Sequence, residues 1–274
     1  MALQHGQLAE AQEIFEEASK ADSKNPYVWT SLAETYLREK QHAKAEAAAS
    51  KAEQLGGADP VIAHALVILY FNWSQELLES AEFTKAADVA SSALKAHPAD
   101  AQLTLALGVA RYGQRRFDDS ITEFLKVIQL NPEIEQPYLF LSRILDQAGP
   151  HLGEITTACE AWAARNPQSA KAQLVLAKAL LASNPRNARA EALLRRSVAL
   201  DGNLWESHYE LGVLLAGKRE YKESAAELTR SIELDPKQPM PHYHLARVYD
   251  RLGEPERAKA ERDAHQRLTG SSTR

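Results

Sequence analysis

Apolar residues recur at three- and four-residue spacing along most of the chain, the pattern of helices that bury one face. One example runs from Tyr221 through Ala225 and Leu228 to Ile232. No segment alternates apolar and polar residues between turn signals, as a half-buried strand would. The twelve prolines stand where helices are expected to begin or end, which suits a residue without a backbone N–H. The pattern therefore predicts an all-α protein.

The helical pattern itself repeats at intervals of about 34 residues. A leucine followed by a small residue recurs at spacings of 34, 35, 35 and 34, at Leu107-Gly108, Leu141-Ser142, Leu176-Ala177, Leu211-Gly212 and Leu245-Ala246. A second, mostly small position recurs at spacings of 34, 41, 34, 35, 35, 34 and 34, at Ala11, Ala45, Ala86, Ser120, Ile155, Ala190, Ser224 and Ala258. Because separate series share one period, the chain is built from a repeated helix–turn–helix unit.

One unit shows the signature clearly: "WESHYELGVLLAGKREYKESAAELTRSIELDP", residues 205–236. It contains the Leu-Gly pair in its first helix, the aromatic Tyr221 at the start of its second helix, and a closing Asp-Pro. A 34-residue unit of this kind resembles the tetratricopeptide repeat family. The resemblance extends from residue 1 to about residue 268. It implies a right-handed superhelical solenoid of antiparallel helix pairs, a soluble repeat protein.

We expect about seven full repeats after an N-terminal half repeat. The expected boundaries are 1–25 for the half repeat, then 26–59, 60–100, 101–134, 135–169, 170–204, 205–238 and 239–268, with a disordered tail at 269–274. Small residues such as Gly212 let the second helix approach the first. Bulky residues such as Leu228 fill the contact between one repeat and the next, which we call the seam. In the last unit the seam positions are Arg262 and His265, so the array is expected to stop there. At the N-terminus only the second helix of a repeat is expected to be complete, which suggests that other segments precede this chain in a longer protein.

The most apolar segment is "VIAHALVILYFNWSQELLES", residues 61–80. Its unit has 41 residues, seven more than the usual 34. Seven residues make two helical turns, about 10 Å, and rotate a face by only about 20°. We expect a lengthened first helix that extends one apolar stripe, with an insertion in the loop or the second helix as the alternative. Either neighbouring segments cover the stripe, or four of its residues form an additional contact patch: Tyr70, Phe71, Trp73 and Leu77.

Composition excludes several classes of protein. The net charge of −5 and the short basic runs flanked by acids do not favour nucleic-acid binding. The longest run without a polar residue has seven residues, Ala65–Phe71, whereas a membrane span needs about twenty, so we expect no membrane insertion. The first residues lack the basic and apolar regions of a signal peptide. The single cysteine does not fix the redox compartment, and the localisation stays open.

Charge is distributed unevenly between the two halves of the chain. Residues 1–137 hold 12 Lys and Arg against 20 Asp and Glu, a net charge of −8, whereas residues 138–274 hold 20 against 17, a net charge of +3. Solvated charged faces explain this simply. The alternatives are end-to-end contacts between copies, or an acidic ligand near the C-terminal half.

Motifs for catalysis or cofactor binding are absent from the sequence, which lacks GxGxxG, GxxxxGK[ST], HExxH, GxSxG and CxxC. The two histidines of His242-Tyr243-His244 point about 200° apart on a helix and cannot share a metal ion. Cys159 stands at a seam position and is expected to be a small buried hydrophobe. Asn72-Trp73-Ser74 fits a glycosylation sequon, but it falls inside a predicted helix. We expect no enzyme activity, no cofactor and no metal.

The resemblance implies that the first helices line a concave groove that holds a peptide or helix of a partner protein. Tyrosine and arginine at groove positions are good anchors for a partner. The groove positions that we select are Tyr112, Phe140, Arg143, Lys171, Lys178, Tyr209, Glu210, Tyr243, His244, Arg247 and Arg251. Some family members bind chaperone tails through Lys, Asn and Arg at set groove positions, which here include Glu34 and Leu105, so that clamp is missing.

The sequence therefore predicts a non-catalytic scaffold for a protein or peptide partner. One alternative is the regulatory or substrate-docking region of a larger enzyme. The other is a self-assembly module that forms homo-oligomers.

Overall fold

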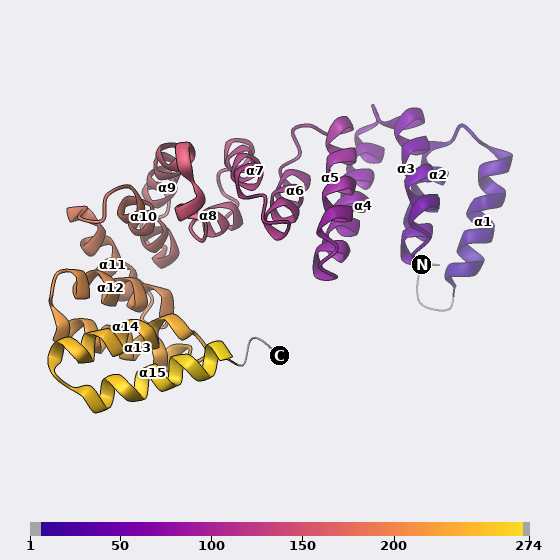
Figure 1. Cartoon of the computed structure of the whole chain (residues 1–274). Helices are drawn as coiled ribbons and strands as arrows, with labels where there is room; N and C mark the ends of the chain where they lie inside the picture. Colours follow the sequence, from indigo (N-terminus) through magenta and orange to yellow (C-terminus); the bar gives the residue numbers. More distant parts are fainter. Residues whose placement is uncertain (1–6, 271–274) are drawn as a thin grey trace. The chain divides into compact units, whose positions relative to one another are not determined.

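The computed structural model describes residues 7–270, which form fifteen α-helices and two short 3₁₀-helices without a strand (Figure 1). This confirms the predicted all-α fold class. The helices are α1 (Leu8–Ala21), α2 (Pro26–Arg38), α3 (His42–Gly56), α4 (Pro60–Glu79), α5 (Phe83–Ala96), α6 (Ala101–Gly113), α7 (Phe117–Leu130), α8 (Gln136–Leu141), η1 (Leu145–Gln147), η2 (Gly149–His151), α9 (Leu152–Arg165), α10 (Ala170–Ser183), α11 (Ala188–Leu200), α12 (Trp205–Gly217), α13 (Tyr221–Leu234), α14 (Pro239–Leu252) and α15 (Pro255–Gly270).

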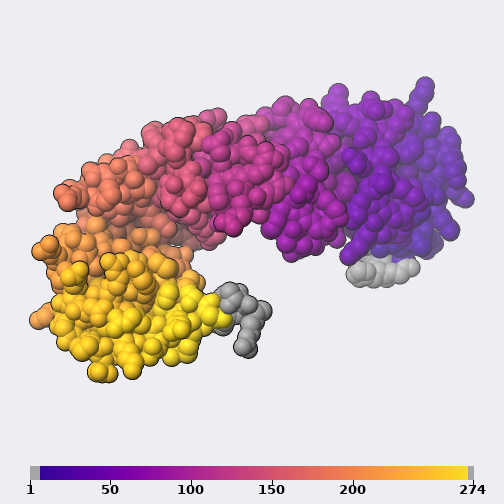
Figure 2. Space-filling view, in the orientation of Figure 1, coloured from indigo at the N-terminus to yellow at the C-terminus, as the bar shows by residue number. Residues whose placement is uncertain are grey.

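The chain divides into two compact units, Met1–Pro137 and Tyr138–Arg274. In the first unit α2 packs on α3, α4 on α5 and α6 on α7; in the second, α10 packs on α11, α12 on α13 and α14 on α15. Within a unit the second helix of a pair also contacts the first helix of the next pair, as α5 does with α6 and α13 with α14. Within each unit the colours in Figure 2 accordingly follow the sequence without interruption. A linear stack of helix pairs buries a continuous core in this way.

Polar side chains fix where several helices begin. Asp59 accepts a hydrogen bond from the Val61 N–H at 2.8 Å, and Asp100 accepts one from the Leu103 N–H at 2.8 Å. Asn25 and Ser169 cap α2 and α10 in the same way. Each cap satisfies a backbone donor that the helix leaves free.

The recurring small position is buried in every repeat. Relative exposure is 2% or less at Ala11, Ala45, Ala86, Ser120, Ile155, Ala190, Ser224 and Ala258. In α13 the Ser224 hydroxyl donates to the Gly212 carbonyl of α12 at 2.7 Å, and Ser120 donates to Gly108 at 3.1 Å. A Cβ added to Gly212 would lie 2.7 Å from Leu228. The predicted close approach of paired helices at the glycine positions is therefore confirmed.

The helix pair expected within 135–169 differs from the others. Its first helix, α8, has only six residues and is followed by η1 and η2. Hydrogen bonds from the Arg143 N–H to the Phe140 carbonyl and from the Ile144 N–H to the Leu141 carbonyl, at 3.0 and 3.1 Å, wind this segment more tightly than an α-helix. Leu141 and Ile144 are nevertheless buried, so the segment still supplies core residues.

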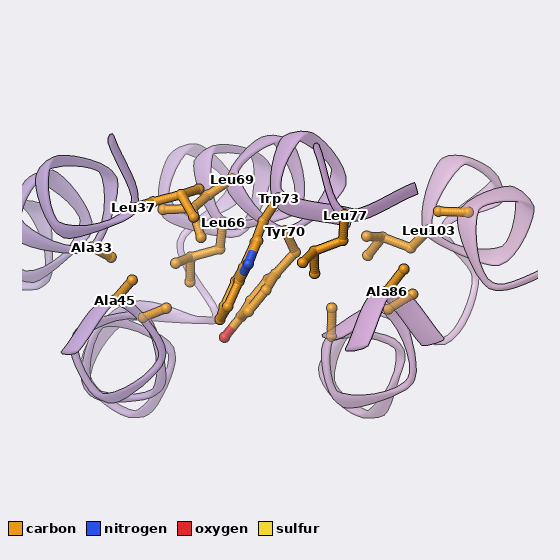
Figure 3. Packing of buried hydrophobic residues seen from close by; sticks show 14 of the residues in the cluster. Ala33, Leu37, Ala45, Leu66, Leu69, Tyr70, Trp73, Leu77, Ala86 and Leu103 are labelled. Atoms are coloured by element: carbon orange, nitrogen blue, oxygen red, sulfur yellow. The ribbon is translucent and has the colours of Figure 1, made fainter. Parts of the chain in front are cut away.

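Helix α4 has 20 residues, whereas the first helices α2, α6 and α12 have 13 each. Its stripe of Leu66, Tyr70, Trp73 and Leu77 is at most 7% exposed and packs on the neighbouring repeats (Figure 3). In the described part of the chain, α4 is the one helix that passes a test of length and apolar composition for crossing a membrane. The stripe is buried, whereas Val61 and Ile68 of the same helix are 63 and 45% exposed.

The last helix, α15, covers the end of the second unit with polar side chains. Arg262 donates to both carboxylate oxygens of Asp250 at 2.8 and 3.1 Å, and the His265 ring lies 5.6 Å from that of Tyr243. The tail predicted from residue 269 is wrong at its start, because the Thr269 hydroxyl bonds to the His265 carbonyl at 3.0 Å within α15. The remainder of that tail, and residues 1–6 of the half repeat, lie outside the described residues.

Candidate functional site

Ten of the eleven predicted groove residues belong to the second unit, and Tyr112 lies on α6 of the first. Within the second unit neighbouring first helices contact each other, α10 with α12 and α12 with α14. We call their shared surface the C-terminal groove face: Lys171, Lys178, Tyr209, Glu210, Val213, Tyr243, His244, Arg247 and Arg251. The other two predicted residues, Phe140 and Arg143, lie on and just after α8, where the guanidinium stacks 5.7 Å from the ring.

Aromatic rings form a connected series across this face. The ring centroids of Tyr209 on α12 and His244 on α14 are 5.6 Å apart, and those of His244 and Tyr243 are 5.2 Å apart. The series continues to Trp205 at 6.2 Å from Tyr209 and to His265 at 5.6 Å from Tyr243. Sequence reasoning did not select Trp205 or His265 as part of the site, because only tertiary packing places them beside the predicted residues.

Two arginines border the aromatic series. Arg247 lies 5.6 Å over the Tyr243 ring and donates a long hydrogen bond of 3.5 Å to its hydroxyl. Both Arg247 and Arg251 are exposed. Within residues 7–270 neither forms an ion pair with a carboxylate. In contrast, the Lys178 ammonium lies 3.4 Å from Glu210, so that cation is already compensated within the protein.

A hollow of about 290 Å³ lies between α12 and α14 beside these arginines. Its lining combines Val213, Tyr221 and Val248 with His244 and the two arginines. Burial, and secondarily the charge of Arg247, lower the pKa of His244 below its ordinary value of 6.5. The imidazole is therefore neutral at neutral pH, and the positive charge of the hollow comes from the arginines.

A larger hollow of about 760 Å³ adjoins α10, α11 and α12. Most of its charged residues are paired within the protein: Lys218 lies 2.7 Å from Glu191 and also contacts Glu220, and Glu210 pairs with Lys178. Arg186 is the one lining charge without an ion pair among the described residues. Hydrogen bonds from Lys218 and Arg195 lower the pKa of the Glu191 carboxyl. This hollow has less uncompensated charge to offer a ligand than the one between α12 and α14.

The additional contact patch suggested on the long helix does not form an exposed surface. Tyr70, Trp73 and Leu77 are 7, 5 and 5% exposed, and Phe71 packs partly against the same core. The adjoining helices cover the stripe because α4 is flanked on both sides by helix pairs. The structure therefore favours the alternative in which neighbouring segments cover most of the stripe.

Comparison with protein-family models identifies the repeats. Models described as tetratricopeptide repeat match residues 2–67, residues 71–133 and 186–239, and residues 227–260. The chain belongs to the tetratricopeptide repeat family. A search of curated protein sequences finds no significant match.

Solved structures show the same tetratricopeptide fold at low sequence identity. MamA from residue 41 to its end, from Desulfovibrio magneticus RS-1, is 22% identical with a TM-score of 0.52, over 62% of this chain and 95% of that one. The thermophilic TPR protein TTC0263 of Thermus thermophilus is 21% identical with a TM-score of 0.53, over 62% and 91%. Yeast Tom70 is 16% identical with a TM-score of 0.55, over 96% of this chain and 55% of that one.

Within residues 7–270 no cluster of three metal-ligating side chains occurs. Burial raises the pKa of the Cys159 thiol to about 12, which keeps it protonated and weakly nucleophilic. His242 lies 2.6 Å from the Glu261 carboxylate, joining α14 to α15. The chemistry that the C-terminal groove face offers is that of recognition, through rings, apolar hollows and two exposed arginines.

Proposed function

We propose that this tetratricopeptide repeat chain is a non-catalytic scaffold whose C-terminal groove face binds an acidic segment of a partner protein. The observation that carries the proposal is the pair Arg247 and Arg251, exposed beside the aromatic series without a carboxylate partner among residues 7–270. Arginine forms two parallel hydrogen bonds to a carboxylate, which gives both affinity and orientation. Aromatic and arginine side chains also dominate binding energy at protein interfaces.

The surrounding side chains define what such a segment needs. An apolar side chain of the partner would enter the hollow between α12 and α14, against Val213 and Tyr221. A carboxylate next to it would reach Arg247 and Arg251. The neutral His244 and the hydroxyl of Tyr243 add hydrogen-bonding groups without adding charge. The segment can be extended or helical, because both forms place an acid beside an apolar anchor.

A random-peptide display library panned against the whole chain tests this proposal. We expect the enriched peptides to contain Asp or Glu beside an apolar residue. The charge-reversing variant Arg247→Glu with Arg251→Glu should bind an enriched peptide at least about 30-fold more weakly, a loss of about 2 kcal/mol. Helicity should not change, because both side chains are exposed.

A matched control separates local recognition from overall charge. Lys237→Glu with Lys259→Glu makes the same change in net charge at exposed positions away from this face, and it should bind the peptide as tightly as the unmodified chain. Enrichment of neutral or basic peptides, or equal weakening by the two double variants, would contradict the proposal.

A further inference from the structure

A third hollow lies against the long helix α4 in the first unit, between the second helices α3 and α5. The hollow has a volume of about 300 Å³. Figure 3 shows Tyr70 and Trp73 reaching from α4 into the space between the helices that carry Ala45 and Ala86, which are α3 and α5. Six of its lining residues matter below: His42, Glu46, Tyr70, Trp73, Asp88 and Val89.

The floor of this hollow is aromatic. The His42 ring stacks on Trp73 with centroids 5.4 Å apart and planes inclined by 9°. The indole Nε1 of Trp73 and the Nδ1 of His42 are buried without a hydrogen-bond partner among the described residues. Trp73 itself is only 5% exposed. Both nitrogen atoms are covered, so the hollow presents ring surface and the carboxylates of its rim to a ligand.

The rim of the hollow is acidic. Glu46 and Asp88 are exposed, and neither forms an ion pair within residues 7–270. The one cation at the rim, Lys85, is paired with Glu82. Burial first, and then the charges of Glu53 and Glu46, raise the pKa of Tyr70 to about 12. The hollow therefore has a negative potential, in the half of the chain whose net charge is −8.

We propose that this hollow binds an arginine side chain from a basic segment of a partner protein. The aliphatic part of an arginine packs on apolar and aromatic surface while its charged end stays near the rim. Here the stem would lie against Tyr70, Trp73 and Val89, and the guanidinium would pair with Glu46 and Asp88. A volume of about 300 Å³ is at the small end of ligand sites, which suits one long side chain better than a folded element.

Arginine fits these residues better than the other occupants of similar size. An acidic side chain would meet the unpaired carboxylates of Glu46 and Asp88, and a neutral one would leave them without a partner. Lysine offers a compact charge, whereas the planar guanidinium stacks on aromatic rings and bonds to two carboxylates at once. The site lies outside the C-terminal groove face, so it does not depend on the function proposed above.

Indole NMR signals can test the site directly, because the chain has four tryptophans. The ¹⁵N-labelled whole chain is titrated with an acetylated and amidated peptide, Gly-Ala-Arg-Ala-Gly, and with the same peptide in which citrulline replaces arginine. Citrulline has nearly the shape of arginine without its charge. The variant Trp73→Phe assigns the Trp73 signal. We expect the arginine peptide to shift that signal saturably and the citrulline peptide to leave it in place.

Two double variants complete the test. Glu46→Gln with Asp88→Asn should weaken binding of the arginine peptide at least about tenfold, as for the loss of charge-assisted hydrogen bonds. Glu10→Gln with Glu13→Gln makes the same change in net charge at exposed positions on α1 and should leave binding unchanged. Equal shifts with the citrulline peptide, no shift of Trp73 with either peptide, or equal weakening by both double variants would overturn the proposal.

Discussion

At the scale of single residues, the spacing of paired helices depends on a missing Cβ and a small hydroxyl. Leu228 packs so close to Gly212 that a residue with a Cβ would clash with it. At the same contact the Ser224 hydroxyl donates a hydrogen bond to the Gly212 carbonyl. The repeat period identified these positions in the sequence. It did not reveal the hydrogen bond, because alanine occupies the serine position in other units.

Gly212→Ala should therefore destabilise the protein, since the added methyl group overlaps Leu228. We expect a loss of about 1–3 kcal/mol, typical of an overpacked core, measured by urea unfolding followed by circular dichroism. Gly217→Ala is the matched control on the same helix, where an added Cβ meets nothing within 4 Å. Stability equal to or above that of the unmodified chain is expected for the control. Similar losses in both variants would contradict the steric explanation.

The imidazole of His244 gives a second prediction for a single residue. Its pKa in the folded protein is lowered below 6.5 by burial and by Arg247, so the unfolded chain binds the proton more readily. The favourable contribution of the neutral imidazole is present above pH 6.5 and is lost as the pH falls below that value. His244→Gln should reduce the drop in melting temperature between about pH 7.5 and about pH 5.5. An NMR titration midpoint of His244 above its ordinary value would show the opposite linkage.

At the scale of helices, the sequence predicted the regular pairs well and α8 poorly. Leu141, Ile144 and Ala148 follow the three- and four-residue spacing of a helix, but successive 3₁₀ turns also place residues of this spacing in a core. The spacing could not distinguish the two forms. For the candidate site, the sequence selected the tyrosines and arginines of α12 and α14. It could not show that the rings touch or that Lys178 is compensated by Glu210, since both depend on packing between helices.

The caps of the first helices lead to a prediction for one element. Asp100→Ala removes the side chain that accepts the Leu103 N–H at the start of α6. We expect the free energy of unfolding to fall by about 1 kcal/mol, the usual value of an N-cap. Asp100→Asn should retain nearly full stability, because asparagine caps helices as well as aspartate does. A loss in the asparagine variant as large as in the alanine variant would instead indicate a role for the charge.

At the scale of the whole molecule, α15 is the last described helix and its seam positions are polar. Arg262 occupies the position held by Phe124, Leu194 and Leu228 in other units, and its guanidinium is held by Asp250. An exposed apolar seam would favour association with other proteins. The Arg262–Asp250 pair makes this surface polar instead.

Arg262→Leu should therefore make the protein associate with itself. We expect the sedimentation coefficient to rise with protein concentration, because the new apolar surface of α15 has no helix to cover it. Arg267→Leu, another exposed position of the same helix, is the control and should sediment nearly as the unmodified chain does. Concentration-independent sedimentation of Arg262→Leu would show that α15 tolerates an apolar end.

The length of α4 has a consequence for how repeats of this kind can change over evolution. Each inserted helical residue turns the following segment by about 100°, so seven residues almost restore the original facing. An insertion of about five would turn the apolar stripe by about 140° and direct Trp73 and Leu77 toward solvent. Insertions and deletions in a first helix should thus survive selection only near whole numbers of turns, at about four, seven or eleven residues. The seven residues of α4 are one such permitted step.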